Sequence, residues 1–251
     1  MLRRTASVSL KRLNLMKISF SSLPQKVPEF DVSEKNLKEI SEFVQKHYEE
    51  RQPPKRAFLD AAIEKLTYFN DVKRVTDLLK LYKRNGQDAS QEQIHRFVEK
   101  CVEVNAEDLA AKLVLAKRHS PVRRNISDDT LTLLTKTLNE KNKISKSLDL
   151  VSIAFRLNLP HENAREEVFD AVVKQSYEEG LVRILNWNKY PNWNESRILQ
   201  ILNGSWDNDQ KERLMPLVEA LGVEGAQEKL STWIKVEEEA QPEEEAQTEE
   251  D

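Results

Sequence analysis

The sequence predicts an all-α fold: a right-handed α-solenoid of about four helix-turn-helix repeats, with a helical C-terminal cap and disordered ends. Three observations lead to this prediction. Only 5 of the 251 residues are glycine and 33% are charged, which favours helices over the turn-rich chains of sheets. Apolar residues recur at helical spacing along most of the chain. Helix pairs follow one another at about 35 residues, a period typical of stacked helix pairs.

The first 22 residues form a basic segment that we separate from the fold. Residues 1–22 contain five basic residues, many serines and no acid. Their apolar residues recur at helical intervals, so the segment would form a basic amphipathic helix. These traits are typical of a mitochondrial targeting presequence, and we therefore expect the protein in the mitochondrial matrix. The alternatives are a basic surface helix of the mature protein and an arm that contacts nucleic acid.

Residues 23–54 are predicted to be a linker followed by an N-terminal helix. Pro24 and Pro28 mark the linker. The helix is expected to begin at Ser33 and to stop at the prolines of residues 52–54. Its apolar stripe consists of Leu37, Ile40, Phe43, Val44 and Tyr48.

Residues 55–190 are predicted to hold the repeats. The expected helix pairs are 55–69 with 71–84, 91–104 with 106–118, 128–140 with 143–157, and 164–176 with 178–187. The corners within the pairs fall at Asn70, Asn105, Asn142 and about Glu179, and asparagine tolerates the left-handed conformation that ends a helix. Ser90 and Gln93 form a predicted capping box at the start of the second pair.

Three stretches carry the resemblance to a known family: "AFLDAAIEKLTYFNDVKRVTDLLKLYKRNG", "IHRFVEKCVEVNAEDLAAKLVLAKRHSPV" and "DTLTLLTKTLNEKNKISKSLDLVSIAFRLNLP". In period and helix pairing they resemble pentatricopeptide repeats. The resemblance implies a mitochondrial helical-repeat protein whose first helices present polar residues to RNA. The matching positions here are Asp60, His95 and Thr132. Only Thr132 has the residue type that the family uses, so base-by-base reading of RNA is not favoured.

Residues 191–236 are predicted to form a helical cap, with a last regular helix near 208–221. The region from the last repeat onward brings together four aromatic residues, Trp187, Tyr190, Trp193 and Trp206. They could cover the apolar end of the solenoid, or they could form a platform on which bases or a partner pack. Residues 237–251 contain nine acids and no basic residue, which predicts a solvated, disordered tail.

The strongest local charge signal lies between Asp108 and Asp128, where no acidic residue occurs. The basic residues of this stretch are Lys112, Lys117, Arg118, Arg123 and Arg124. Such a cluster would attract the phosphates of RNA, or else it would contact a protein partner. Alternatively, these cations lie in a solvated loop and complement the end of a helix.

Several classes of function have no support in the sequence. The four histidines and the single Cys101 do not have the spacing of metal ligands, and the five glycines form no nucleotide-binding loop. No apolar run is long enough for a membrane span. We therefore expect no enzyme activity, no metal, no cofactor and no small-molecule substrate.

The sequence thus favours a non-catalytic subunit of a mitochondrial ribonucleoprotein assembly, with the mitochondrial ribosome as the favoured host. Its expected partners are other subunits of that complex, with ribosomal or messenger RNA as a further partner. The alternative is a protein-binding accessory subunit or assembly factor of a respiratory-chain complex that does not contact RNA.

Overall fold

The computed structural model describes residues 30–50, 52, 54–116, 120–187, 193–223 and 227–233. Within these ranges the regular structure consists of twelve α-helices and one short 3-10 helix, without a strand. The prediction of an all-α fold is therefore confirmed for this part of the chain. The predicted presequence of residues 1–22 and the predicted disordered tail of residues 237–251 lie outside it.

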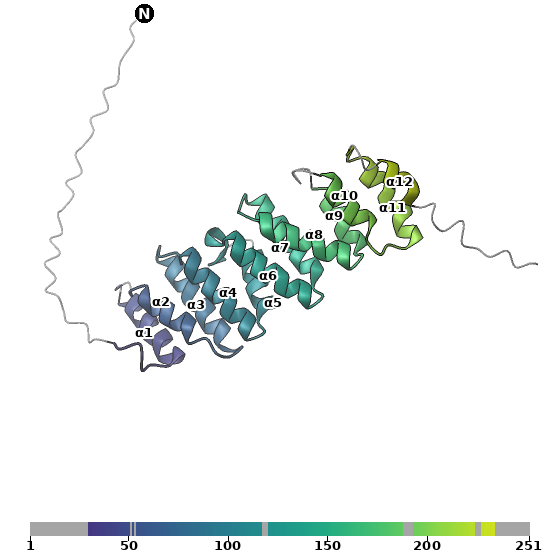
Figure 1. Ribbon diagram of the computed structural model, residues 1–251. Coiled ribbons are helices and arrows are strands. Elements are labelled where there is room, and N and C mark those ends of the chain that lie inside the picture. The colour runs from purple at the N-terminus through teal and green to yellow at the C-terminus, as the bar shows by residue number, and fades with distance from the viewer. Residues whose placement is uncertain are drawn as a thin grey trace, which may run out of the picture.

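The helices follow one another along an elongated array, with α1 at one end and α12 at the other (Figure 1). The first six are α1 (Leu37–Glu49), α2 (Ala57–Glu64), α3 (Asp71–Arg84), α4 (Gln91–Glu103), α5 (Glu107–Leu115) and, after the 3-10 helix η1 (Arg123–Asn125), α6 (Asp128–Glu140). The other six are α7 (Ile144–Arg156), α8 (Glu162–Lys174), α9 (Glu178–Leu185), α10 (Glu195–Leu202), α11 (Asn208–Glu219) and α12 (Gln227–Trp233).

The helices form two interleaved series. The even-numbered helices begin at residues 57, 91, 128, 162, 195 and 227, which are 34, 37, 34, 33 and 32 residues apart. The odd-numbered helices begin at residues 37, 71, 107, 144, 178 and 208, which are 34, 36, 37, 34 and 30 residues apart. Helices of one series contact each other, as α2 contacts α4 and α5 contacts α7. The helical period therefore continues beyond residue 190, through α10 to α12.

The four predicted helix pairs correspond to α2 to α9, although several ends differ. The N-terminal helix begins at Leu37 and not at Ser33, because Asn36 caps it in a reciprocal pair with Glu39. The predicted capping box of Ser90 and Gln93 is confirmed. Helix α2 ends at Glu64, five residues earlier than predicted, which places residues 65–70 in a turn.

Three of the four corners within the pairs share one left-handed backbone conformation. Asn105 and Asn142 have φ angles of 57°, and Ser176 has 49°, so all three lie in the left-handed region. The N–H of the residue after each corner donates to a carbonyl five residues back, for example Lys143 to Leu138 at 2.8 Å. The corner predicted at Asn70 does lie directly before α3, but Asn70 has a φ of −67° and so does not use the left-handed conformation. The corner predicted at Glu179 lies three residues earlier, at Ser176.

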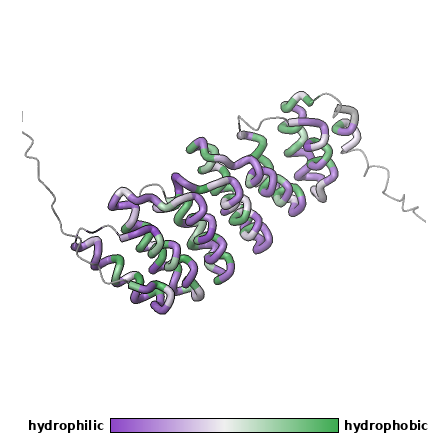
Figure 2. Tube along the Cα trace, turned by 60° about the vertical axis from the view of Figure 1, so that its left-hand side comes forward, coloured by the Kyte–Doolittle hydropathy of each residue, from purple (hydrophilic) through white to green (hydrophobic). Residues whose placement is uncertain are grey.

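The core is a continuous cluster of buried apolar side chains that extends from α1 to α12. Fully buried examples are Phe97 on α4, Leu134 on α6 and Phe169 on α8. Hydrophobic and hydrophilic residues alternate within each helix along the whole array, and no single helix is apolar throughout (Figure 2). Each helix therefore buries one stripe against its neighbours. Removing a large buried side chain such as Leu134 would cost about 2–5 kcal/mol.

Ion pairs connect helices that lie one repeat apart. Glu107, whose side chain is only 3% exposed, accepts from the Nζ atoms of Lys141 and Lys143 at 2.8 and 2.9 Å. Lys143 and Lys146 also pair with Asp108, at 2.7 and 2.6 Å. Burial by itself would raise the pKa of Glu107, but the hydrogen bonds from the two lysines outweigh it and hold the pKa below its usual value.

The left-handed corner after α7 gives a test of this backbone conformation. Asn158 is exposed, with φ of 54°, and its N–H donates to the Phe155 carbonyl at 3.0 Å. We expect Asn158→Val to destabilise the protein by about 1–2 kcal/mol, because a β-branched residue strains this conformation. Asn158→Gly should be nearly neutral. Urea denaturation measures the stability of both variants. Equal midpoints would contradict the interpretation that the left-handed conformation restricts the residue at this position.

The Glu107 ion pairs predict that the free energy of unfolding depends on pH. Because the folded pKa is lowered, the stabilisation is present above the unfolded pKa of about 4.3 and is lost as the pH falls through the folded value. We expect Glu107→Gln to lower the free energy of unfolding at pH 7 by about 1–2 kcal/mol, since the partner lysines are partly solvated. Urea denaturation from pH 7 to low pH should show the difference from wild type shrinking.

The matched control is Glu140→Gln, which neutralises an exposed carboxylate on α6 and should change the stability little. A loss for Glu107→Gln that is the same at neutral and at low pH would contradict the ionic origin of the effect.

Candidate binding surface around helix α3

Helix α3 is the most basic helix of the described array. Within its bounds lie five basic residues and two acidic ones. Its apolar stripe, which includes Val75, Leu79 and Tyr82, is buried. The cations occupy the remaining positions, and among them Lys73, Arg74 and Arg84 are exposed. The amphipathic pattern therefore directs positive charge outward from a helix whose apolar stripe is buried.

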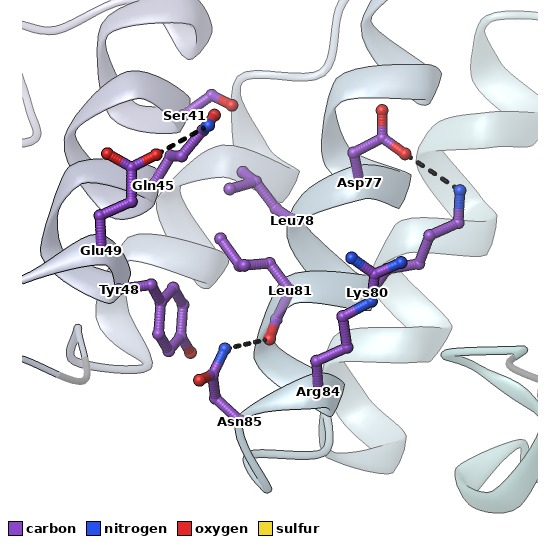
Figure 3. A pocket seen from close by; sticks show the side chains of 10 residues that line it. All are labelled: Ser41, Gln45, Tyr48, Glu49, Asp77, Leu78, Lys80, Leu81, Arg84 and Asn85. Carbon is purple, nitrogen blue, oxygen red and sulfur yellow. Dashed lines mark hydrogen bonds and ion pairs between the residues drawn. The ribbon is translucent and has the colours of Figure 1, made fainter. Parts of the chain in front are cut away.

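A groove of about 510 Å³ lies between α1 and α3. Figure 3 shows Leu78 and Leu81 on the α3 side of this groove, opposite Tyr48 of α1. Its lining is of mixed charge, because Glu49 of α1 faces the Lys80 and Arg84 side of α3. The Tyr48 hydroxyl donates to Gln87 Oε1 at 3.0 Å and so links α1 to the turn after α3.

A second groove, of about 370 Å³, lies on the other side of α3. It is lined by residues of α3, of the preceding turn and of α5, namely Phe69, Asn70, Val72, Lys73, Thr76, Leu109, Lys112 and Leu113. This lining is largely apolar and contains two lysines and no carboxylate. The two grooves flanking α3 thus differ in charge.

The loop that carries η1 is held against the end of α3. The Nζ atom of Lys83 donates to the Ser120 carbonyl at 2.5 Å, and Asn125 Nδ2 donates to the Ala89 carbonyl at 2.7 Å. The Arg123 guanidinium donates to the Ala116 carbonyl at 3.2 Å, which closes the loop onto the end of α5. Arg84 and Arg124 remain exposed at this junction.

The five residues of the predicted basic cluster do not all lie in the same environment. Lys112 lines the groove between α3 and α5. Arg123 is partly buried and Arg124 is exposed. Lys117 and Arg118 lie outside the described residues. The structure adds Lys83 and Arg84, which sequence reasoning missed because the predicted cluster began after Asp108. The excess of cations within α3 was the signal that could have found them.

The three predicted inner-face positions all lie on even-numbered helices. Asp60 accepts a hydrogen bond from Gln93 Nε2 at 2.9 Å. His95 shares a hydrogen bond with the Thr130 hydroxyl at 2.9 Å. The Thr132 hydroxyl donates to the carbonyl of residue 128, one turn back in its own helix, at 2.8 Å. These polar groups are therefore already used within the chain, two of them between successive helices of one series.

The predicted aromatic group is not a single exposed platform. Trp206 is only 5% exposed, and its Nε1 donates to the Ile201 carbonyl at 2.6 Å. Trp193 packs edge to face on Phe169, with ring centroids 6.0 Å apart. Trp187 is partly buried, and Tyr190 lies outside the described residues. Trp206 and Trp193 therefore contribute to packing at the α8 to α11 end of the array.

The two helix series differ in charge. The even-numbered helices contain 14 acidic and 7 basic residues, whereas the odd-numbered helices contain 13 of each. The acidic excess lies on the series that carries Asp60, His95 and Thr132. An RNA backbone would therefore be repelled by the even-numbered series and would favour α3.

The described part of the chain was searched for clusters of metal-binding side chains and for membrane-spanning helices. No group of three or more His, Cys, Asp or Glu side chains is placed there to hold a metal ion. Cys101 is fully buried, and burial raises the pKa of its thiol to about 12, so it stays protonated and is not nucleophilic at neutral pH. Among the described residues, no helix has both the length and the apolar character needed to cross a membrane.

With this geometry established, we compared the chain with known proteins. Neither a scan against protein-family models nor a search of curated proteins gives a match to this chain.

Proposed function

We propose that the protein is a non-catalytic α-solenoid that serves as an architectural subunit of a mitochondrial ribonucleoprotein assembly. The mitochondrial ribosome is the favoured host. In this proposal the repeats resemble pentatricopeptide repeats, and the protein contacts both neighbouring subunits and RNA. The observation that carries the proposal is the concentration of outward positive charge on α3 and η1, within a described array whose other α-helices have at most one excess cation each.

The order of the helices supports the solenoid classification. Most helices contact the next helix of their series, as α4 contacts α6 and α6 contacts α8, and the chain progresses along the array without returning (Figure 1). Such an architecture offers a long outer surface, which suits a subunit that bridges several partners. The right-handed sense is part of the proposal.

RNA would be bound through its phosphates and not through its base edges. Arg84, at the end of α3, and Arg124, in η1, are both exposed and are therefore accessible to phosphates. Asp60 and His95 already form hydrogen bonds to the next helix of their series, so reading a base would require breaking them. The protein would accordingly bind RNA with little sequence preference.

The mitochondrial location rests on residues 1–22, with five basic residues and no acid. Import assays with and without this segment would test the location separately from the binding activity.

The second candidate is a protein-binding accessory subunit or assembly factor of a respiratory-chain complex. The acidic excess of the even-numbered helices favours it, because that surface would attract a basic protein partner and repel RNA. In this case the cations around α3 would be solvated or would contact a partner protein.

Replacing two exposed arginines distinguishes the candidates. We expect Arg84→Ala/Arg124→Ala to weaken binding to single-stranded RNA and to lower the slope of log affinity against log salt by about 1.4, or about 0.7 for each lost phosphate contact. When mitochondrial lysates are sedimented at raised salt, the variant protein should no longer cosediment with the RNase-sensitive particles that contain the wild type. RNA binding is measured by fluorescence anisotropy at several salt concentrations.

The matched control is Lys136→Ala/Lys174→Ala, which removes two exposed cations from the even-numbered series. We expect the control to keep the RNA affinity and the salt slope of wild type. Unchanged RNA binding by the arginine variant, or association of the wild type with a membrane complex that resists RNase, would favour the accessory subunit.

A further inference from the structure

Two aromatic side chains next to α3 are exposed. Tyr68 and Phe69 are 73% and 53% exposed, and Leu157 is the other large hydrophobic residue that is exposed in the described part of the chain. Two adjacent exposed aromatic rings are costly to leave in water and are enriched at protein interfaces. Their position therefore points to a partner.

The turn that carries these rings is well defined. The Asp71 carboxylate accepts from the Tyr68 N–H at 3.1 Å, and the N–H groups of Asp71 and Val72 donate to the carbonyls of Tyr68 and Phe69. Helix α2 has already ended at Glu64, so the rings are not part of an amphipathic stripe. The backbone thus holds both rings outward before any partner binds, which lowers the entropy cost of binding.

Phe69 also lines the groove between α3 and α5. Val72 and Thr76 of α3 and Leu109 and Leu113 of α5 contribute to the lining. The groove, of about 370 Å³, is open at the surface and can receive aliphatic or aromatic side chains of a peptide. Asn70 and Thr76 also line the groove, but Thr76 is only 7% exposed and the lining is largely apolar, which favours a protein segment over RNA.

The positive charge around the groove indicates the charge that a partner should carry. Lys73 and Lys112 are exposed in the lining, and no carboxylate accompanies them. The nearest acids in sequence are engaged elsewhere, since Asp71 caps the turn and Asp108 pairs with Lys143 and Lys146. A bound segment would therefore meet two cations that lack an ionic partner within the described chain.

We infer that the groove between α3 and α5 is a docking site for a protein segment in which an aromatic or aliphatic anchor is flanked by acidic residues. The anchor packs on Phe69 within the groove, next to Tyr68, and the acids pair with Lys73 and Lys112. This site differs from the arginines assigned to RNA and does not depend on that assignment.

Peptide selection on the isolated protein tests the inference. Random peptides of about 16 residues, displayed on phage, are selected for binding to the full-length protein. Peptides that also bind the Phe69→Ala variant are then removed. We expect enriched peptides to combine an apolar anchor with an excess of Asp and Glu. As synthetic peptides they should lose about tenfold or more in affinity with Phe69→Ala and with Lys73→Glu/Lys112→Glu, measured by fluorescence anisotropy.

The matched control is Leu157→Ala, which removes an exposed apolar side chain at the end of α7 and should leave the affinities unchanged. Circular dichroism verifies that each variant keeps its helices. The inference is overturned if no enriched peptide depends on Phe69, or if the enriched peptides are basic. A short oligouridine whose binding depends on Phe69, in the absence of such peptides, would make the groove an RNA site instead.

Discussion

None of the helices from α1 to α12 can bury its apolar stripe alone, and the rest of the described structure follows from that constraint. Each helix of eight to fourteen residues from α1 to α11 is amphipathic, and the buried residues of one helix pack on the helices one and two places along. The result is a core that extends through the array as a continuous cluster. Stability then depends on contacts between helices that are close in the sequence.

The same constraint determines where polar side chains can form hydrogen bonds and ion pairs between helices. A helix meets its successor after about one period, so hydrogen bonds and ion pairs recur at that separation. Glu107 pairs with Lys141 and Lys143, Asp149 with Arg183, and Glu178 with Arg213. These contacts hold each helix in register with the next. They also use polar side chains, such as Asp60, that would otherwise be available to a ligand.

The stacking leaves surfaces of different chemistry on the outside. The even-numbered helices are acidic, whereas α3 is basic and is flanked by two grooves. Exposed arginines near η1 suit a phosphate backbone, and the apolar groove beside Phe69 suits a protein segment. A subunit that holds RNA and protein together needs both kinds of surface, and this combination supports the proposed architectural role.

The sequence by itself determined the features that depend on neighbours within one helix or one turn. Helical periodicity predicted the pairs from α2 to α9, and the capping box at Ser90 and the left-handed corners at Asn105 and Asn142 were predicted because capping and turn preferences are local. Only the tertiary structure determined the side-chain contacts between residues that are about one repeat apart in the sequence. It joined Lys83 to the η1 loop, buried Trp206 and engaged His95 with Thr130, because these contacts depend on how successive helices stack and no local pattern encodes them.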